Sequence, residues 1–214
     1  MERNITDKLY MKGIKNLIFD FGGVLIDLDR ERCIRNFRQI GVENVESLLN
    51  VYGQQGLFRE HEKGMIDDAT FRQGVRDLAQ LPQLTDAAID EAWNSFLVGI
   101  PTYKLEALLE LRKDYMVYLL SNTNSIHWEW SKANAFPMKS FRVEDYFEKI
   151  YLSYEMKMVK PDACIFEKVL SDAGIAAEET LFLDDSAENC AAARQLHIQT
   201  YTPKAHEDWR HLFE

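Results

Sequence analysis

Six polar residues follow or flank apolar segments, at places where a protein could gather them into one reactive site. They are Asp20, Ser121, Asn122, Lys160, Asp184 and Asp185. Asp20 comes directly after the apolar run Leu17-Ile18-Phe19, and the acidic pair ends the segment "ETLFLDD". Taken singly, each residue also suits a turn, a helix cap or a solvated surface. Because ligands bind beyond the carboxyl ends of strands in doubly wound sheets, such a sheet would collect all of them on one rim.

The residue types of this set favour phosphate chemistry. Carboxylates at neighbouring strand ends repel each other unless a cation lies between them, and oxygen ligands favour Mg²⁺. The cation would offset the charge of a phosphate group, so that the carboxylate of Asp20 could attack phosphorus. Ser121 and the backbone N–H groups after it would hold the phosphoryl oxygens. Lys160 would supply a positive charge that orients the nucleophile and stabilises the transition state.

The pattern of apolar segments predicts a fold that would position these residues. Strands are predicted at residues 15–19 and in "YMVYLLS", "KIYLSY", "ETLFLDD" and "IQTYT". The later strands alternate with helical segments such as "KLEALLELRKD", "DACIFEKVLSDAG" and "AENCAAARQLH". Continuously apolar strands that alternate with helices are typical of an α/β protein, in which a doubly wound parallel sheet is covered on both faces.

A helical insertion is predicted after the first strand. Residues 30–96 show apolar positions at helical spacing and no strand pattern. The segment "DDATFRQGVRDLAQL" starts at an Asp that suits a helix cap, and "TDAAIDEAWNSFL" starts at Thr85. We therefore expect a Rossmann-like core of residues 1–27 and 98–214, with a helical cap of residues 28–97 inserted into it.

The composition argues against several classes of partner. The chain has 214 residues and a formal net charge of −10, which does not suit general binding to nucleic acid or to an anionic membrane. No segment approaches the about 18 apolar residues of a membrane span, and the start of the chain lacks the apolar run of a signal peptide. Three separated cysteines suit a reducing compartment. We expect a cytoplasmic monomer or homodimer whose partner is a small phosphorylated metabolite.

Four segments, in this order, resemble the motifs of the haloacid dehalogenase superfamily: "LIFDFGGVL", "VYLLSNT", "VKPDACIF" and "TLFLDDSAEN". The predicted insertion resembles the type 1 helical cap of that superfamily. The stretches "FREHEKGMIDDATF", "LLSNTNSIH" and "LDDSAENC" are similar to bacterial sugar-phosphate phosphatases, in particular the α-D-glucose-1-phosphate phosphatase type. The resemblance implies a Mg²⁺-dependent phosphatase that cleaves a small phosphate monoester, such as a hexose 1-phosphate, through an aspartyl-phosphate intermediate.

The resemblance also implies a role for each residue. Asp20 would be the nucleophile, with Lys160 and Ser121 as its catalytic partners. The substrate phosphate would be bound by Ser121, Asn122, Lys160, Gly22 and Gly23. The metal would be held by Asp20, the carbonyl of Gly22, and Asp185, with Asp184 bound directly or through water.

Gly22 departs from the pattern of the superfamily. Most of its phosphatases carry a second Asp at this position as general acid and base, a role worth typically about 10²–10⁴ in rate. Three explanations stay open. In the first, another group is the proton donor, with His61, Glu62 and His127 as candidates that also suit structural roles. In the second, the leaving group needs little protonation. In the third, the protein binds a phosphate ester or a partner without hydrolysis. Because phosphatases of the glucose-1-phosphate type also have glycine here, we favour the first two.

Other features favour phosphate chemistry or have structural interpretations. Dehalogenases of the superfamily also lack the second Asp but need no metal, so the acidic pair at 184–185 favours a phosphatase, and a mutase would need the missing Asp. The aromatic residues of the stretch "SIHWEWSKANAFPM" are expected to pack against the core or cap rather than line a substrate entrance or a dimer face; they are Trp128, Trp130 and Phe136. Asp27 and Asp29 are expected to form the hinge into the cap.

Overall fold

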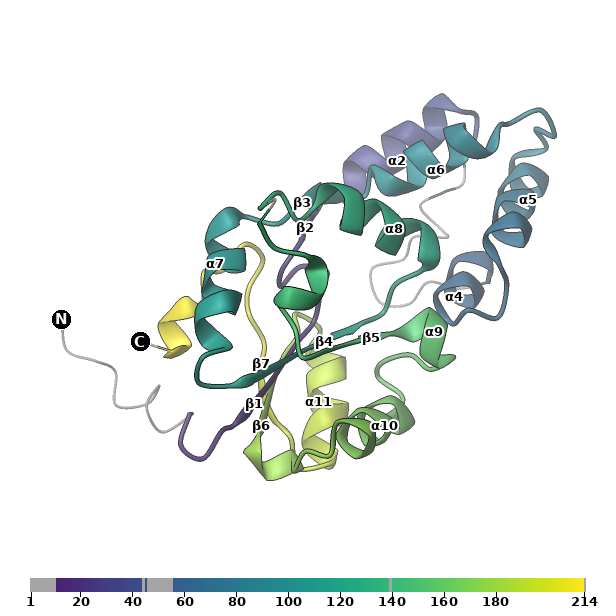
Figure 1. Cartoon of the computed structure of the whole chain (residues 1–214). Helices are drawn as coiled ribbons and strands as arrows, with labels where there is room; N and C mark the ends of the chain where they lie inside the picture. The colour runs from purple at the N-terminus through teal and green to yellow at the C-terminus, as the bar shows by residue number, and fades with distance from the viewer. Residues whose placement is uncertain (1–10, 44, 46–55, 139, 214) are drawn as a thin grey trace.

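A five-stranded parallel sheet forms the centre of the molecule (Figure 1). The computed structural model describes residues 11–43, 45, 56–138 and 140–213. The strands lie in the order β5-β4-β1-β6-β7, and every neighbouring pair is parallel. They are β1 (Asn16–Phe19), β4 (Met116–Ser121), β5 (Lys149–Leu152), β6 (Thr180–Leu183) and β7 (Gln199–Tyr201). The predicted doubly wound α/β fold is confirmed.

β1 lies in the middle of this sheet, and all four of its residues are buried. Phe19 at its end pairs with Leu119 of β4 on one side and with Leu183 of β6 on the other. The three strands therefore end side by side. The polar residues that follow them share one edge of the sheet, as the sequence predicts.

Helices cover both faces of the sheet (Figure 1). Leu17 and Phe19 belong to one hydrophobic cluster and Ile18 to another, because successive side chains of a strand point to opposite faces. The first cluster includes residues of α7 (Thr102–Leu111), α8 (Ser125–Asn134) and the 3₁₀ helix η3 (Trp209–Phe213). The second includes residues of α10 (Ala163–Ala173) and α11 (Ala187–Gln195).

A group of helices between the first two core strands packs around its own aromatic cluster. Its described helices are α2 (Arg30–Gln39), α4 (Leu57–Glu62), α5 (Asp68–Ala79) and α6 (Asp86–Asn94). The cluster contains Phe37, Phe58, Phe71 and Trp93, all with at most 1% of their surface exposed. Asp67 and Thr85 cap α5 and α6 through their side chains, so the predicted starts of these helices are confirmed.

The chain enters and leaves this helical region through an antiparallel ribbon that the sequence analysis did not predict. The ribbon pairs β2 (Asp27–Leu28) with β3 (Leu97–Gly99). Strands this short carry no periodic signal, which explains why they were not predicted. We propose that residues 28–97 form the inserted cap, a division that the ribbon and the separate aromatic cluster support. The expectations for residues 1–10 and 46–55 lie outside the described residues.

α8 is a second element that the sequence analysis did not predict, because its segment is aromatic on more than one side. Asn124 caps it by accepting a hydrogen bond from the His127 N–H at 3.0 Å. The rings of Trp128 and Phe136 lie 5.6 and 6.3 Å from the ring of Phe21, so their expected packing against the core is confirmed. The remaining elements are α9 (Ser153–Met156), η1 (Val143–Asp145) and η2 (Ala177–Glu179).

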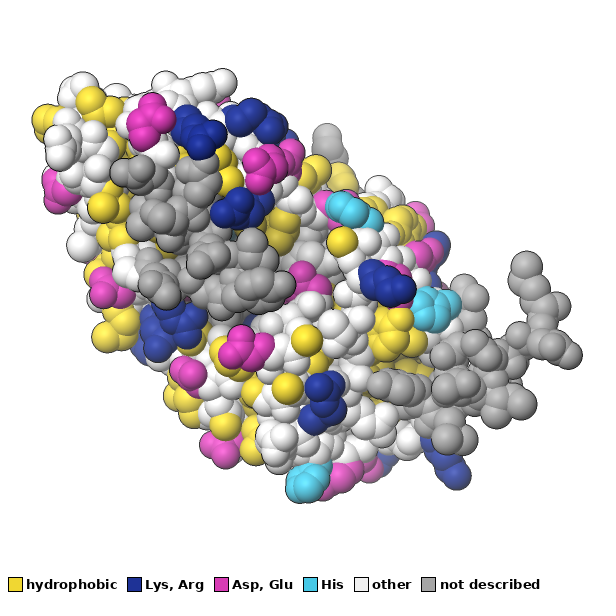
Figure 2. All heavy atoms as spheres, turned by 180° about the vertical axis from the view of Figure 1, so that it is seen from behind, with side chains coloured by type: hydrophobic (Ala, Val, Ile, Leu, Met, Phe, Trp, Pro, Cys, Tyr) yellow, Lys and Arg dark blue, Asp and Glu magenta, His cyan; other side chains and the backbone are white. Residues whose placement is uncertain are grey.

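The surface and the helix lengths bear on the expected partners. No helix in the described part of the chain is long and apolar enough to cross a membrane. On the face shown in Figure 2, the coloured basic side chains lie among acidic and apolar ones rather than in one continuous stripe. The cysteines are free: Cys33 and Cys190 are buried, and Cys164 is exposed.

Candidate active site

The side chain of Lys160 joins the ends of β1 and β6. Its Nζ lies 2.7 Å from Asp20 Oδ1 and 2.7 Å from Asp184 Oδ2. The third donor of the ammonium group reaches the carbonyl of Leu120 at 3.0 Å. All three charged residues are at most 8% exposed. This buried ammonium group has three oxygen acceptors, two of which are carboxylates, so all of its donors are paired.

Asn122 holds Lys160 in this position. The side-chain amide of Asn122 donates to the Lys160 carbonyl at 2.9 Å and accepts from the Lys160 N–H at 2.9 Å. The side chain of Asn122 is thus committed to the backbone of Lys160. The amide nitrogen keeps a second N–H donor, so the expected contact of Asn122 with phosphate would use this donor or the backbone N–H.

Three carboxylates could hold a metal ion together. Oxygen atoms of Asp20, Asp184 and Asp185 lie within 4.8 Å of one another. This all-oxygen set fits the preference of Mg²⁺. The residues present therefore suit the expected metal.

Asp184 and Asp185 differ in their surroundings. Oδ1 of Asp184 accepts from the Ser186 N–H at 2.8 Å and from the Asn189 amide at 3.0 Å, and Oδ2 accepts from Lys160. Asp185 is exposed, and no comparable set of donors engages its carboxylate among the described hydrogen bonds. We infer that Asp185 is the acidic pair's direct metal ligand and that Asp184 orients Lys160.

Gly23 leaves the space that the Asp185 carboxylate occupies. Gly23 has a φ of +72°, and a Cβ there would lie 2.2 Å from Asp185 Oδ2. Any other residue at position 23 would be strained and would displace the carboxylate. Gly22 is less restricted, because a Cβ there would meet only Leu28 Cδ1, at 3.2 Å.

Burial and neighbouring negative charge together raise the pKa of the nucleophile candidate. Burial, together with the Asp184 and Asp185 carboxylates, raises the pKa of Asp20 from 3.8 to about 8, although Lys160 opposes the shift. Although the Asp185 residue is exposed, desolvation by the groups around its carboxylate, followed by the charge of Asp184, also raises the pKa of Asp185. A site that disfavours its own ionised carboxylates is one in which a bound cation restores them to the charged form.

Ser121 and the loop after it lie at the end of β4, beside β1. Ser121 is buried at the last position of β4. The next turn is held by Ser153, whose Oγ accepts from the Thr123 N–H at 2.9 Å and lies 2.8 Å from the Glu62 carbonyl, to which it can donate. Ser153, which the sequence analysis did not identify, thereby connects the proposed phosphate-binding loop with the cap.

The two histidines proposed as proton donors are held in the packing of the cap. The ring of His127 stacks on Trp93 at 4.1 Å, and its Nε2 donates to the Trp93 carbonyl at 3.1 Å. Burial lowers the pKa of His127 to about 3. His61 stacks on Phe71 at 4.4 Å and donates from Nε2 to Asp68 at 2.8 Å. These contacts support the structural interpretation of both residues.

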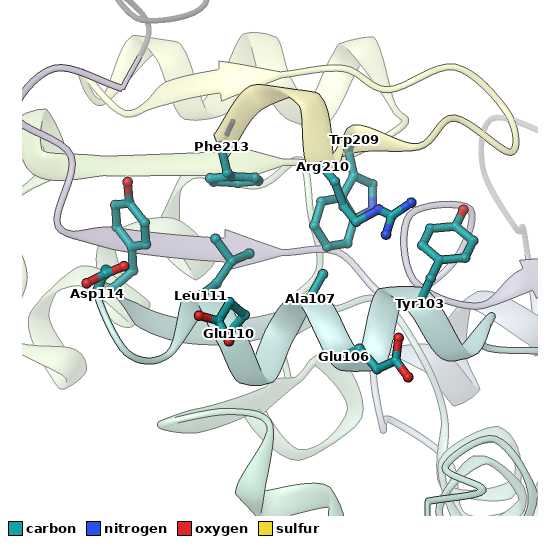
Figure 3. A pocket seen from close by; sticks show the side chains of 10 residues that line it. Tyr103, Glu106, Ala107, Glu110, Leu111, Asp114, Trp209, Arg210 and Phe213 are labelled. Carbon is teal, nitrogen blue, oxygen red and sulfur yellow. The ribbon is translucent and has the colours of Figure 1, made fainter.

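A pocket of about 460 Å³ lies elsewhere, between α7 and η3 (Figure 3). Its lining includes Tyr103, Leu111, Trp209 and Phe213. None of the site residues predicted from the sequence lines this pocket. The candidate active site therefore rests on the charged cluster at the strand ends.

The buried, neutral His127 predicts acid sensitivity. Its pKa is about 3 in the folded state against 6.5 ordinarily, so the unfolded chain takes up a proton that the folded chain does not as the pH falls below 6.5. This contribution to stability is complete above that pH and is lost by about 1.4 kcal/mol per pH unit below it. His127→Gln, which keeps a donor but does not titrate, should flatten the dependence of the urea unfolding free energy on pH between about 6 and about 4. An unchanged slope would contradict this origin.

Comparisons with known proteins agree with the fold and with the motifs. Residues 14–197 match the family of haloacid dehalogenase-like hydrolases. The chain is 37% identical over 197 residues to D-ribitol-5-phosphate phosphatase of Bacteroides thetaiotaomicron, covering 92% of this chain and 95% of that protein. A haloacid dehalogenase family enzyme of the same organism, crystallised with magnesium and inorganic phosphate, is 59% identical. Its TM-score is 0.92 over 94% of this chain and 99% of that chain. A haloacid dehalogenase-like hydrolase of Porphyromonas gingivalis is 37% identical, with a TM-score of 0.85 over 92% and 94% of the two chains. On this basis, the protein belongs to the haloacid dehalogenase-like hydrolase family.

Proposed function

We propose that this protein is a Mg²⁺-dependent phosphatase that hydrolyses a small sugar or polyol phosphate through an aspartyl-phosphate at Asp20. The observation that carries the proposal is the buried Lys160, which pairs with Asp20 beside the exposed carboxylate of Asp185. The related enzyme crystallised with magnesium and inorganic phosphate supports it. The free cysteines agree with an enzyme of the cytoplasm, where we place it.

The orientation of Asp20 suits nucleophilic attack. Oδ1 accepts hydrogen bonds from the Phe21 N–H and from Lys160, both at 2.7 Å. These bonds fix the plane of the carboxylate, and we assign Oδ2 as the attacking oxygen. Oδ2 forms a bond to phosphorus while the bond to the leaving alkoxide breaks and the alkoxide takes up a proton. Water then attacks the acyl phosphate, which releases inorganic phosphate and the Asp20 carboxylate.

Bound Mg²⁺ would supply positive charge that offsets the phosphate and keeps Asp20 ionised. The residues that would hold it are Asp20, Asp185 and the carbonyl of Gly22. Lys160 contributes a second, permanent charge, since its carboxylate partners raise its pKa above the ordinary value despite its burial. Lys160 can thus stabilise the negative charge of the transition state without changing protonation.

The cap adjoins the proposed phosphate-binding loop at two points. Ser153 contacts the carbonyl of Glu62, and Ser125, directly after the loop, donates to Asp68 at the start of α5. We propose that this boundary encloses the leaving group. One relative is named for a ribitol phosphate, whose phosphate is carried by a primary alcohol. A primary alkoxide is a poor leaving group unless it is protonated. Such a substrate therefore favours the explanation in which another group of the protein donates the proton.

Asp20→Asn tests the nucleophile. It should reduce the release of phosphate from ribitol 5-phosphate in Mg²⁺ by at least about 10⁴-fold, because an amide does not attack phosphorus. Asp114→Asn, which removes an exposed carboxylate at the end of α7, is the control and should leave the rate unchanged. Binding of phosphate esters to the wild type without any turnover over a set of metabolites would favour the non-catalytic alternative.

Asp185→Ala tests the metal ligand. It should raise the Mg²⁺ concentration that half-saturates the protein in calorimetry by about 10–100-fold, because one of the charged ligands is lost. Glu188→Ala removes an exposed carboxylate three residues further on and should change this value little. If Asp185→Ala were half-saturated at the same Mg²⁺ concentration as the wild type, Asp185 would not be a metal ligand.

Gly22→Asp tests the missing acid. The contact with Leu28 Cδ1 involves the end of a flexible side chain, so an Asp can be accommodated. If proton transfer limits the rate, kcat on ribitol 5-phosphate should rise by up to about 10²-fold, and kcat on p-nitrophenyl phosphate should change little, because nitrophenolate leaves unprotonated. Gly22→Asn, of the same shape, should give no gain. An unchanged rate on the alkyl phosphate would show that another group already transfers the proton.

A further inference from the structure

Lys104 is a second buried lysine, and the proposed chemistry does not use it. It lies in α7, and its side chain is 1% exposed. Its Nζ donates to the carbonyl of Val24 at 2.8 Å and lies 3.4 Å from the carbonyl of Leu25 and 3.7 Å from Asp27 Oδ1. Burial of an ammonium group is costly unless its donors are satisfied. All of these acceptors belong to the turn that follows Asp20.

The carbonyl of Val24 receives a second donor from the end of the chain. The indole Nε1 of Trp209 donates to it at 3.2 Å. Figure 3 shows Trp209 and Arg210 of η3 facing Tyr103 and Ala107 of α7. The ring of Trp209 also packs on Phe19, the residue before Asp20, at 4.9 Å. Two elements distant in sequence therefore converge on one carbonyl group.

The turn itself needs such support. It is closed by three backbone hydrogen bonds, from the Gly23 N–H to the Ile26 carbonyl and from the Leu25 and Ile26 N–H groups to the Phe21 carbonyl, at 2.8–2.9 Å. It contains two successive glycines, which leave its backbone more freedom than other residues would. It also connects Asp20 to Asp27, the first residue of the ribbon that leads into the cap.

We propose that Lys104 is a positioning residue that anchors the turn of residues 21–27 and thereby places the Gly22 carbonyl and the start of the cap relative to Asp20. The inference rests on the proposed function of this site. An apolar side chain would fill the same space without a charge to pair. The ammonium group of Lys104, by contrast, contacts the carbonyls of Val24 and Leu25 and the carboxylate of Asp27 at the same time. These contacts restrict the backbone of a turn whose two glycines do not restrict it themselves.

Lys104→Met tests the anchor, because it keeps most of the length of the side chain and removes the donors. Amide hydrogen exchange of the metal-free protein should become at least about tenfold faster at Gly23, Leu25 and Ile26, since a hydrogen bond to a charged donor is lost. The amide of Asp20, which donates to Leu183 within the sheet, should keep its protection. Lys113→Met, which removes an exposed lysine next to the end of α7, is the matched control and should change neither.

Two further readouts concern the reaction. In Lys104→Met, Mg²⁺ affinity measured by calorimetry should fall by about tenfold, and kcat should fall by about 10–100-fold with a smaller change in KM. A purely structural role would instead lower the unfolding free energy and leave these values unchanged in the folded protein. Lys104→Arg, which restores charged donors, should recover part of the Mg²⁺ affinity.

The outcomes separate this inference from the proposed function. If the three turn amides exchange in Lys104→Met at the same rate as in the wild type, the anchor is overturned, even when the wild type is an active phosphatase. Equal acceleration across the turn and the sheet overturns it as well, because it would indicate global destabilisation. Exchange in Lys104→Met could be faster only in the turn while the wild type hydrolyses no phosphate ester. That pair of results would support the anchor and reject the proposed function. If Lys104→Met does not fold, Trp209→Phe removes the other donor to Val24, and the same exchange criteria apply to it.

Discussion

The ammonium group of Lys160, buried between the carboxylates of Asp20 and Asp184, is the interaction on which the rest of the site depends. Loss of one partner from a buried ion pair typically costs about 3–5 kcal/mol, so these groups can exist here only together. The order of the sheet makes the arrangement possible, because β1 and β6 are adjacent and end in register. Asn122 then fixes the backbone of Lys160 from the end of the other neighbouring strand. The order of the strands therefore determines which charged groups meet in the cluster.

Asp184 and Asp185 are adjacent but have different roles, because the first is buried and the second is exposed. Asp184 faces the interior, where Ser186, Asn189 and Lys160 occupy its oxygens. Asp185 faces outward against Gly23, where its carboxylate remains open to a cation. The raised pKa of Asp20 follows first from its burial and then from the same crowding of carboxylates. A metal-free site is thus held in an electrostatically unfavourable state that the proposed Mg²⁺ would relieve.

The glycine pair and the cap explain how this core could serve a particular ester. Gly22 removes a proton donor from the usual position and leaves the backbone carbonyl in place. The buried histidines are committed to cap packing, so the identity of the proton donor depends on what the cap brings to the leaving group. Ser153 and Ser125 contact Glu62 and Asp68, and so join the proposed phosphate-binding loop to the proposed cap. Lys104 and Trp209 hold a different segment, the turn of residues 21–27 that contains the glycine pair, by donating to the carbonyl of Val24.

The sequence by itself determined the parallel sheet, the helices α7, α10 and α11 that alternate with its strands, and the polar motif residues that gather at its edge. Buried strands carry continuous apolar runs, and helix caps have local signatures at Asp67 and Thr85, so a linear pattern is enough to find them. Short or aromatic elements such as β2, β3 and α8 carry no such pattern and were missed. The tertiary structure alone decided that Asn122 holds Lys160, that His127 is buried and that Lys104 and Trp209 meet at Val24. The physical reason is that these hydrogen bonds join residues from 34 to 185 positions apart, and their geometry exists only after the sheet, the cap and the end of the chain have packed together.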